Sequence, residues 1–207
     1  MKKSSILILI IICLVGCKKG SNETTITGEI KGLGTDTLYL YGMDELYDRI
    51  DTIYVENDKF SYTTSVDTIT SAYLLLKNRI EYPVFLDKGN KIKIKGDTIN
   101  LNFLTISGNI YNEEFTDFQK ALEDPADPSE KAGEETVDKR ITVEKANTAE
   151  EMAEEFILQH HSSYVSLYLL DKYFVQKETP DFSKIKKLVE VMTGVLQDKP
   201  YIAVSYT

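Results

Sequence analysis

Two cysteines are the residues of this chain with the greatest potential for covalent chemistry, and both stand near its start. A cysteine thiolate can attack a substrate, ligate a metal ion or exchange with a disulfide. Cys13 and Cys17 lie in the stretch MKKSSILILIIICLVGCKKGSN, and no cysteine follows them. The redox and nucleophilic chemistry open to this protein therefore depends on what becomes of these two residues.

The stretch around Cys17 has the pattern of a secretory signal. The chain starts with a basic pair, Ile6 to Val15 form an apolar run, and Gly16 precedes Cys17. Such a run is too short to cross a bilayer comfortably, because a spanning helix needs roughly 20 apolar residues. Leu14-Val15-Gly16-Cys17 resembles the lipobox of bacterial lipoproteins, a family in which the signal is cleaved before the cysteine and the cysteine is acylated.

The lipobox resemblance implies a lipoprotein signal peptide at residues 1–16, a lipid anchor on Cys17 and a polar tether at residues 17–23. Several acyl chains on one residue give stable membrane attachment. Cys13 would leave with the signal, and the sulfur of Cys17 would become a thioether. The mature chain would then contain no free thiol and no disulfide, which excludes cysteine catalysis. An ordinary signal peptide with a chance cysteine is the alternative.

The other candidate groups do not predict an enzyme. His160 and His161 are the only histidines, and adjacent side chains on a helix point about 100° apart, so they cannot readily share a metal ion. Asp124, Asp127 and Glu130 lack the alternating spacing of a calcium loop. The chain has no Gly-x-Ser-x-Gly elbow. We therefore expect no catalytic residue, no metal site and no cofactor.

Charge limits the partners. The formal charge is −9, and removal of Lys2 and Lys3 with the signal would make it −11. A strongly acidic chain repels phosphate backbones, so we expect no binding of nucleic acid. The roughly 190 residues that remain after cleavage suffice for one medium domain or two small ones.

The first half of the mature chain, residues 24–108, has a period of two that turn residues interrupt every few positions. Evenly spaced short strands predict an antiparallel β-sandwich or a barrel-like domain. The expected strands are Thr25–Ile30, Thr37–Tyr41, Ile50–Val55, Lys59–Thr63, Ala72–Lys77, Tyr82–Leu86, Ile92–Lys95 and Leu101–Ser107.

The second half, residues 109–207, is predicted to be helical, which makes the fold class α+β. An acidic linker with proline and glycine is expected near 124–147. The expected helices are Asn109–Leu122, Glu150–Gln159, Tyr164–Phe174 after a cap at Ser162 or Ser163, and one that starts near Thr179-Pro180-Asp181.

An apolar stripe marks the last of these helices. Ile185, Leu188, Val189, Met192 and Val195 or Leu196 recur at helical spacing. Packing into the core is the favoured interpretation, and a ligand groove or a surface for a partner protein is the alternative.

Four segments carry a family resemblance: ITGEIKGLGTDTLYLYG, DTIYVENDKFSYTT, VFLDKGNKIKIKGD and LTISGNIYNEEFTDF. They resemble the strand-rich domain of unknown function at the N-terminus of lipidated thiol:disulfide interchange proteins (AhpC/TSA, TlpA-like) of Gram-negative gut anaerobes. In that family, a helical spacer and a thioredoxin-like domain with a Cys-x-x-Cys motif follow. Nothing in this chain aligns with that motif, so the redox activity of the family is not transferred to any residue here.

A repeated tripeptide suggests a modification. Asp-Thr-aliphatic sequences place Thr37, Thr52, Thr68 and Thr98 in a pattern that resembles the O-glycosylation acceptor on exported proteins of the same bacterial lineage. The equally balanced alternative is structural, because aspartate can close a turn before a strand that begins with Thr-Ile.

We therefore expect a lipoprotein of the Gram-negative cell envelope that faces the periplasm and acts as a non-catalytic accessory or binding module, with an envelope protein as a candidate partner. One alternative is a truncated remnant of a thiol:disulfide oxidoreductase without its catalytic domain, which the apolar, tyrosine-bearing end of the chain favours. The other is an unrecognised envelope enzyme.

Overall fold

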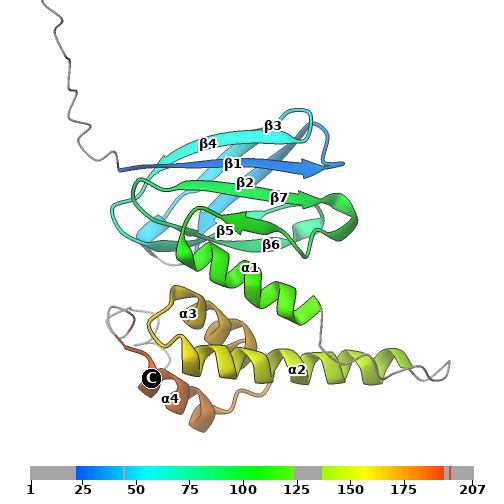
Figure 1. Cartoon of the computed structure of the whole chain (residues 1–207), viewed down its shortest axis with the longest axis vertical. Helices are drawn as coiled ribbons and strands as arrows, with labels where there is room; N and C mark the ends of the chain where they lie inside the picture. The colour runs from blue at the N-terminus through cyan, green and yellow to red at the C-terminus, as the bar shows by residue number, and fades with distance from the viewer. Residues whose placement is uncertain (1–21, 44, 124–136, 194–195, 197–207) are drawn as a thin grey trace, which may run out of the picture.

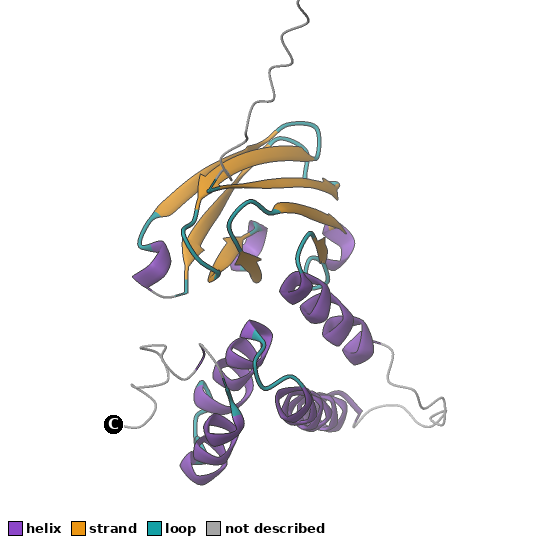
Figure 2. Ribbon diagram, turned by 60° about the vertical axis from the view of Figure 1, so that its left-hand side comes forward, coloured by secondary structure: helices purple, strands orange, loops and turns teal. Residues whose placement is uncertain are grey.

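The computed structural model describes residues 22–43, 45–123, 137–193 and 196. Strands form a two-layered N-terminal part, and helices form the C-terminal part beneath it (Figures 1 and 2). The predicted signal peptide and Cys17 lie outside the described residues, as does the segment 124–136 of the predicted linker. None of the described helices is both long enough and apolar enough to cross a membrane.

Two four-stranded sheets make up the N-terminal part. One sheet has the order β4-β1-β7-β8, with bounds Lys59–Ser65, Glu23–Lys31, Lys91–Asp97 and Thr105–Ser107. The other has the order β3-β2-β5-β6, with bounds Ile50–Val55, Asp36–Gly42, Thr70–Leu75 and Glu81–Leu86. The predicted α+β class and sandwich are confirmed, and the sheets are not closed into a barrel. Three short 3-10 turns, η1 (Glu45–Tyr47), η2 (Lys77–Arg79) and η3 (Thr98–Asn100), connect strands.

One strand pair departs from the antiparallel prediction. β1 lies antiparallel to β4 but parallel to β7, with Ile26 opposite Ile92 and Lys31 opposite Asp97. A period of two indicates which side chains share a face and carries no information on strand direction. The sequence Lys91–Asp97 illustrates the shared faces, because Ile92 and Ile94 are buried between the sheets while the lysines around them are exposed.

The last predicted strand is shorter than expected. Only Thr105–Ser107 pairs with β7, whereas the sequence predicted a strand from Leu101. The carboxylate of Asp97 accepts a hydrogen bond from the Ile99 amide at 2.9 Å and starts η3 in place of an extended chain. The chain therefore leaves the sheet after β7 and returns to it only for three residues.

The helices are α1 (Ile110–Glu123), α2 (Val137–Gln159), α3 (Tyr164–Leu170), which continues into the π-helical turn η4 (Asp171–Val175), and α4 (Phe182–Val191). Ser163, one of the two predicted caps, accepts a hydrogen bond from the Val165 amide at 3.2 Å. The predicted linker was wrong over residues 137–147, where the backbone is already helical. Residues 137–147 contain no proline or glycine and have two acidic residues against three basic ones. The helix that they begin has buried Ala153 and Ile157 in its C-terminal half.

The apolar stripe is core. Ile185, Leu188 and Val189 on α4 are at most 4% exposed, and Met192 is fully buried. The helix ends at Val191, and Met192 is extended, so the stripe is not one continuous helical face as predicted. The interpretation of the stripe as a surface for a partner is wrong, because these side chains are covered by the protein itself.

Helix α1 holds the two sheets together. Its N-cap Asn109 accepts a hydrogen bond from the Asn112 amide at 2.9 Å. Asn112 accepts from the Phe85 amide at 3.0 Å and donates to the Phe85 carbonyl at 2.8 Å, on edge strand β6. Thr116 does the same on edge strand β8, since its hydroxyl accepts from the Ile106 amide and donates to the Ile106 carbonyl, both at 2.9 Å. Two side chains of one helix thus form hydrogen bonds with the backbone of one edge strand in each sheet.

We expect Asn112→Ala to lower the free energy of unfolding by about 2–3 kcal/mol, because it leaves the buried Phe85 amide without its acceptor. Urea denaturation of the full chain, followed by far-UV circular dichroism, measures the change. Asn102→Ala is the control: Asn102 is exposed, and its loss should change stability by no more than about 0.5 kcal/mol. Equal effects of the two substitutions would contradict the role of Asn112.

Candidate functional site

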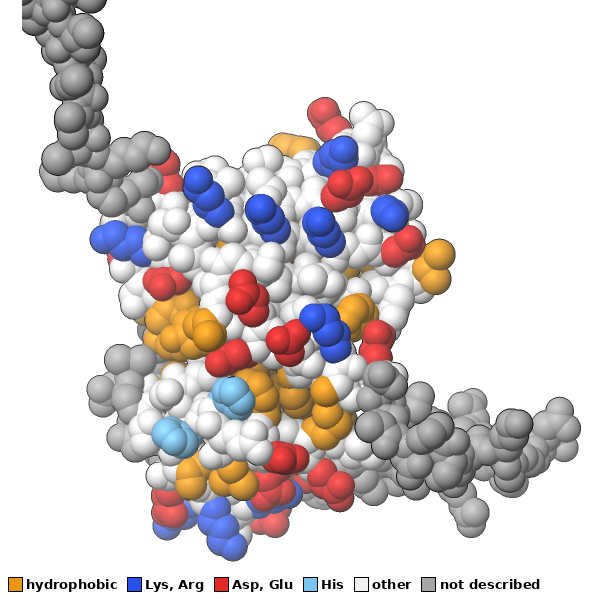
Figure 3. All heavy atoms as spheres, in the orientation of Figure 1, with side chains coloured by type: hydrophobic (Ala, Val, Ile, Leu, Met, Phe, Trp, Pro, Cys, Tyr) orange, Lys and Arg blue, Asp and Glu red, His pale blue; other side chains and the backbone are white. Residues whose placement is uncertain are grey.

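The outer face of the β4-β1-β7-β8 sheet carries a set of lysines. Period-two alternation places Lys91, Lys93 and Lys95 of β7 on this face, together with Lys31 of β1 and Lys59 of β4, and all five are exposed. Figure 3 shows lysine side chains in a row across the upper part of the molecule. We call these five residues the lysine face.

Register brings the lysine face next to hydroxyls and carboxylates. Glu29 stands between Lys59 and Lys95 on neighbouring strands. Lys93 lies between Thr27 of β1 and Ser107 of β8, and Lys91 lies opposite Thr25. The face is therefore a polar layer in which positive charge exceeds negative charge.

The lysines of this face lack the short ion pairs that other lysines of the described residues form. Elsewhere, lysines have short ion pairs: Lys77 with Asp36 at 3.0 Å and Lys184 with Glu154 at 2.7 Å. Within the part of the chain that the structure describes, no ion pair involves a member of the lysine face. A protein of charge −9 thus carries more lysines than carboxylates on one face of this sheet.

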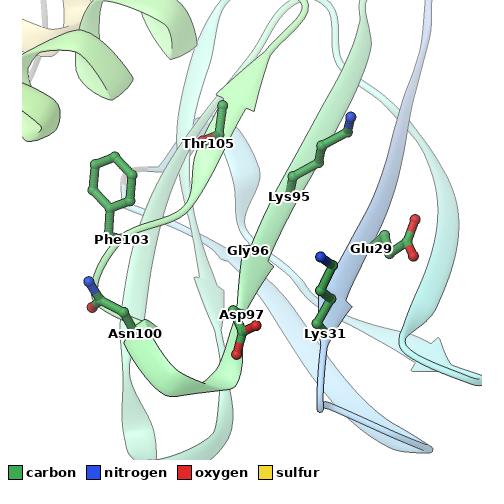
Figure 4. Close-up of a pocket in the computed structure, with 8 residues that line it drawn as sticks. All are labelled: Glu29, Lys31, Lys95, Gly96, Asp97, Asn100, Phe103 and Thr105. Atoms are coloured by element: carbon green, nitrogen blue, oxygen red, sulfur yellow. The ribbon is translucent and has the colours of Figure 1, made fainter.

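A groove opens at the end of this face, with a volume of about 500 Å³. It lies where the chain leaves the sheet between β7 and β8, and Figure 4 shows its residues: Lys31 and Glu29 stand to one side, and Asn100 and Phe103 to the other. The groove-lining residues are Glu29, Lys31, Lys95, Gly96, Asp97, Asn100, Phe103 and Thr105.

The backbone at Gly96 fixes the shape of this groove. A Cβ atom at Gly96 would lie 2.3 Å from Cδ2 of the fully buried Leu104, so only glycine lets β7 and the returning chain approach so closely. The Asp97 cap of η3 then holds Asn100 beside the strand end. The groove combines ammonium groups, carboxylates, an amide and an aromatic ring, and this set can bind a ligand that carries both negative charge and hydroxyls.

A second cavity, of about 270 Å³, lies between the other sheet and the turn from α3 to η4. Its lining includes Tyr73 of β5, Tyr168, Gln176 and Asp171, a carboxylate only 7% exposed. Gln176 Nε2 donates to Asp171 Oδ2 at 2.6 Å. Burial raises the pKa of Asp171, and burial together with the charge of Asp171 raises the pKa of Tyr73 to about 12.

The structure does not gather the four predicted glycosylation threonines. Thr37 is half-buried at the start of β2, Thr52 is exposed in the middle of β3, and Thr68 is exposed between β4 and β5. Thr98 is half-buried in η3, where its hydroxyl lies over Gly32. Glycosylation at Thr37, Thr52, Thr68 and Thr98 stays a prediction.

The two histidines have separate environments. His160 stacks on Phe156 with ring centroids 4.2 Å apart, and its Nδ1 is 3.5 Å from Oε1 of Glu114. Nδ1 of His161 instead lies 3.0 Å from the hydroxyl of Thr193. Among the described residues, no group of three or more histidine, cysteine, aspartate or glutamate side chains is placed to hold a metal ion.

The comparisons with known proteins concern the strand-rich part. Residues 24–115 match a domain of unknown function (DUF4369). The match confirms the domain of unknown function expected from the sequence segments, and no thioredoxin-like domain is detected beside it in this chain. The DUF4369 match covers both sheets, the whole groove and the first half of α1, including Asn112. A comparison with curated proteins found no match.

The raised pKa of Asp171 gives the second cavity a pH signature. A carboxyl group whose folded pKa is raised stabilises the protein below its ordinary pKa of 3.8 and loses that contribution as pH rises through the folded value. We therefore expect Asp171→Asn to stabilise the protein at pH 7, with the gain vanishing below pH 3.8.

Urea unfolding of the full chain at several pH values measures the gain from Asp171→Asn. The control is Glu178→Gln, which removes an exposed carboxyl group and should change stability by no more than about 0.5 kcal/mol. A stabilisation by Asp171→Asn that is the same at pH 3 and pH 7 would disprove the assignment.

Proposed function

We propose that this protein is a lipoprotein of the Gram-negative cell envelope that presents its strand-rich domain to the periplasm as a non-catalytic binding or accessory module. The observation that carries the proposal is Leu14-Val15-Gly16-Cys17 at the end of an apolar run, directly before a domain of the DUF4369 type. An envelope protein is a candidate partner of the anchored domain.

The distance from anchor to domain supports this arrangement. Asn22 is the first described residue, and it is tied to the turn after β4: its carbonyl accepts from the Val66 amide at 3.2 Å, and its amide donates to Asp67 at 2.9 Å. The five residue steps from Cys17 to Asn22 span at most about 18 Å. An acylated Cys17 would therefore keep the sandwich close to the bilayer surface.

Binding is favoured over catalysis by the character of the groove. Charged groups accelerate reactions most in sites from which water is excluded. The groove on the lysine face is open, and Glu29, Lys31 and Lys95 are exposed. Such an arrangement suits reversible recognition of a ligand by charge and hydrogen bonds.

The anchor predicts a modified N-terminus. When the full-length gene is expressed in a Gram-negative host, the mature protein should start at Cys17, carry acyl chains and partition into the membrane fraction. Mass spectrometry of the N-terminal peptide checks this directly. Cys17→Ser should abolish acylation, whereas Cys13→Ser, which changes a residue inside the signal, should leave it intact. An unmodified peptide that starts elsewhere, and whose cleavage resists inhibition of the lipoprotein signal peptidase, would contradict the proposal.

The second functional prediction concerns redox activity. The purified mature protein should not accelerate the reduction of insulin by dithiothreitol, because exchange requires a thiolate and the sulfur of Cys17 is expected to be a thioether. Insulin turbidity is the readout, with a thioredoxin as positive control. Acceleration that disappears in the Cys17→Ser variant would mean that Cys17 is a working thiol.

A further inference from the structure

We propose that the groove between β7 and β8 binds an acidic saccharide, a sugar unit that carries a carboxylate. The proposal rests on the proposed function as a binding module, since it names the class of ligand that the module would take. Three features of the groove support it: its two lysines, its mixture of hydrogen-bond donors and acceptors, and its aromatic wall.

Two lysines of the groove are placed to contact the anionic group of a ligand. Lys31 and Lys95 are diagonal neighbours on adjacent parallel strands, since Lys95 lies opposite Glu29 and Lys31 lies opposite Asp97. Diagonal side chains of this length can reach a common group. Neither lysine forms a short ion pair among the described residues, although Asp97 lies opposite Lys31 and Glu29 lies opposite Lys95. Both ammonium groups can therefore turn to a ligand carboxylate without breaking an ion pair.

The acceptors exclude a bare inorganic anion. Glu29 and Asp97 also line the groove, and their carboxylates would repel a small anion that offers no hydrogen to donate. Asp97 uses Oδ1 for the Ile99 amide, and no hydrogen bond of the described residues involves its Oδ2. The hydroxyls of a sugar could donate to these oxygens and to the amide oxygen of Asn100. The ligand that satisfies both sets of groups is a polyhydroxylated anion.

The aromatic wall adds a surface for the sugar ring. Phe103 is half-buried, and its ring stands on the side of the groove opposite Lys31 (Figure 4). Ligand sites commonly combine aromatic surface with a few convergent polar groups. The C–H face of a pyranose fits against such a ring while its hydroxyls and carboxylate reach the polar side.

The position of the groove argues against a lipid headgroup or a nucleic acid. β1 enters the sheet at Glu23, next to the proposed anchor, and the groove lies at its other end, at Lys31. Eight residue steps along the strand separate these ends by roughly 26 Å. The groove is thus at the end of β1 remote from the membrane attachment. Phosphate backbones are disfavoured by the overall charge of −9.

Isothermal titration of the detergent-solubilised full-length protein with trigalacturonate tests the proposal. We expect saturable binding that weakens with added salt, and no binding of the neutral galactose trimer. Lys31→Gln and Lys95→Gln should each weaken binding about fivefold, and the double variant about 25-fold, as expected for the loss of exposed charged contacts. Phe103→Leu should weaken trigalacturonate binding while the far-UV spectrum stays unchanged.

Lys91→Gln is the matched control. Lys91 is exposed on the same strand and face, but it lies outside the groove, so its loss should leave the affinity unchanged. Equal losses for Lys91→Gln and Lys95→Gln would reduce the effect to general charge attraction and overturn the proposal. The proposal also falls if no saturable binding occurs, or if inorganic phosphate or a glutamate-rich peptide competes as strongly as trigalacturonate.

The experiments test the proposed lipid anchor and the proposed ligand independently. Trigalacturonate binding by a protein without acylated Cys17 would overturn the lipid anchor and leave the groove assignment standing. An acylated protein without trigalacturonate binding would do the reverse.

Discussion

The architecture depends on α1, because this helix forms hydrogen bonds with one edge strand of each sheet in a sandwich that does not close on itself. The Asn112 side chain forms hydrogen bonds with the backbone amide and carbonyl of Phe85 on β6. The Thr116 hydroxyl does so with the backbone amide and carbonyl of Ile106 on β8. Unpaired strand edges invite association with other chains, and natural proteins cover them. The DUF4369 match extends through Phe115 and so includes Asn112, one of the two residues that make these contacts. The first helix therefore belongs structurally to the strand-rich domain, and its far side carries Phe118 against Phe156 of α2.

The sequence predicted what local patterns determine. Alternation located strands such as Ile50–Val55, and the cap at Ser163 marked the start of α3. Alternation could not give strand direction, so the parallel pairing of β1 and β7 was missed. Composition also misled where packing decides, since residues 137–147, predicted as linker, are helical and α4 stops at Val191 although the apolar stripe continues.

The candidate sites also differ in whether local sequence or long-range packing determines them. The prediction for Cys17 rests on a contiguous motif, whereas the groove joins residues from β1, β7 and the η3 loop. The alternating lysines of β7 were visible in the sequence as a strand pattern, but nothing local placed Lys31 beside them. Asp171 likewise gives no sequence signal, because its burial depends on contact between α3–η4 and a strand about 100 residues earlier, where Tyr73 lies. Long-range contacts of this kind set the chemistry and are absent from local sequence.

The parallel pairing of β1 with β7 is also what creates the groove. Since the two strands run in the same direction, their C-terminal ends, at Lys31 and Asp97, lie side by side at the same end of the sheet. An antiparallel pair would place Lys31 at the opposite end of β7, away from Lys95 and from the η3 loop. The same direction puts the entry of β1, and with it the proposed anchor, at the far end of the strand. The direction of this one pairing thus separates the end of the domain nearest the proposed anchor from the end that carries the groove.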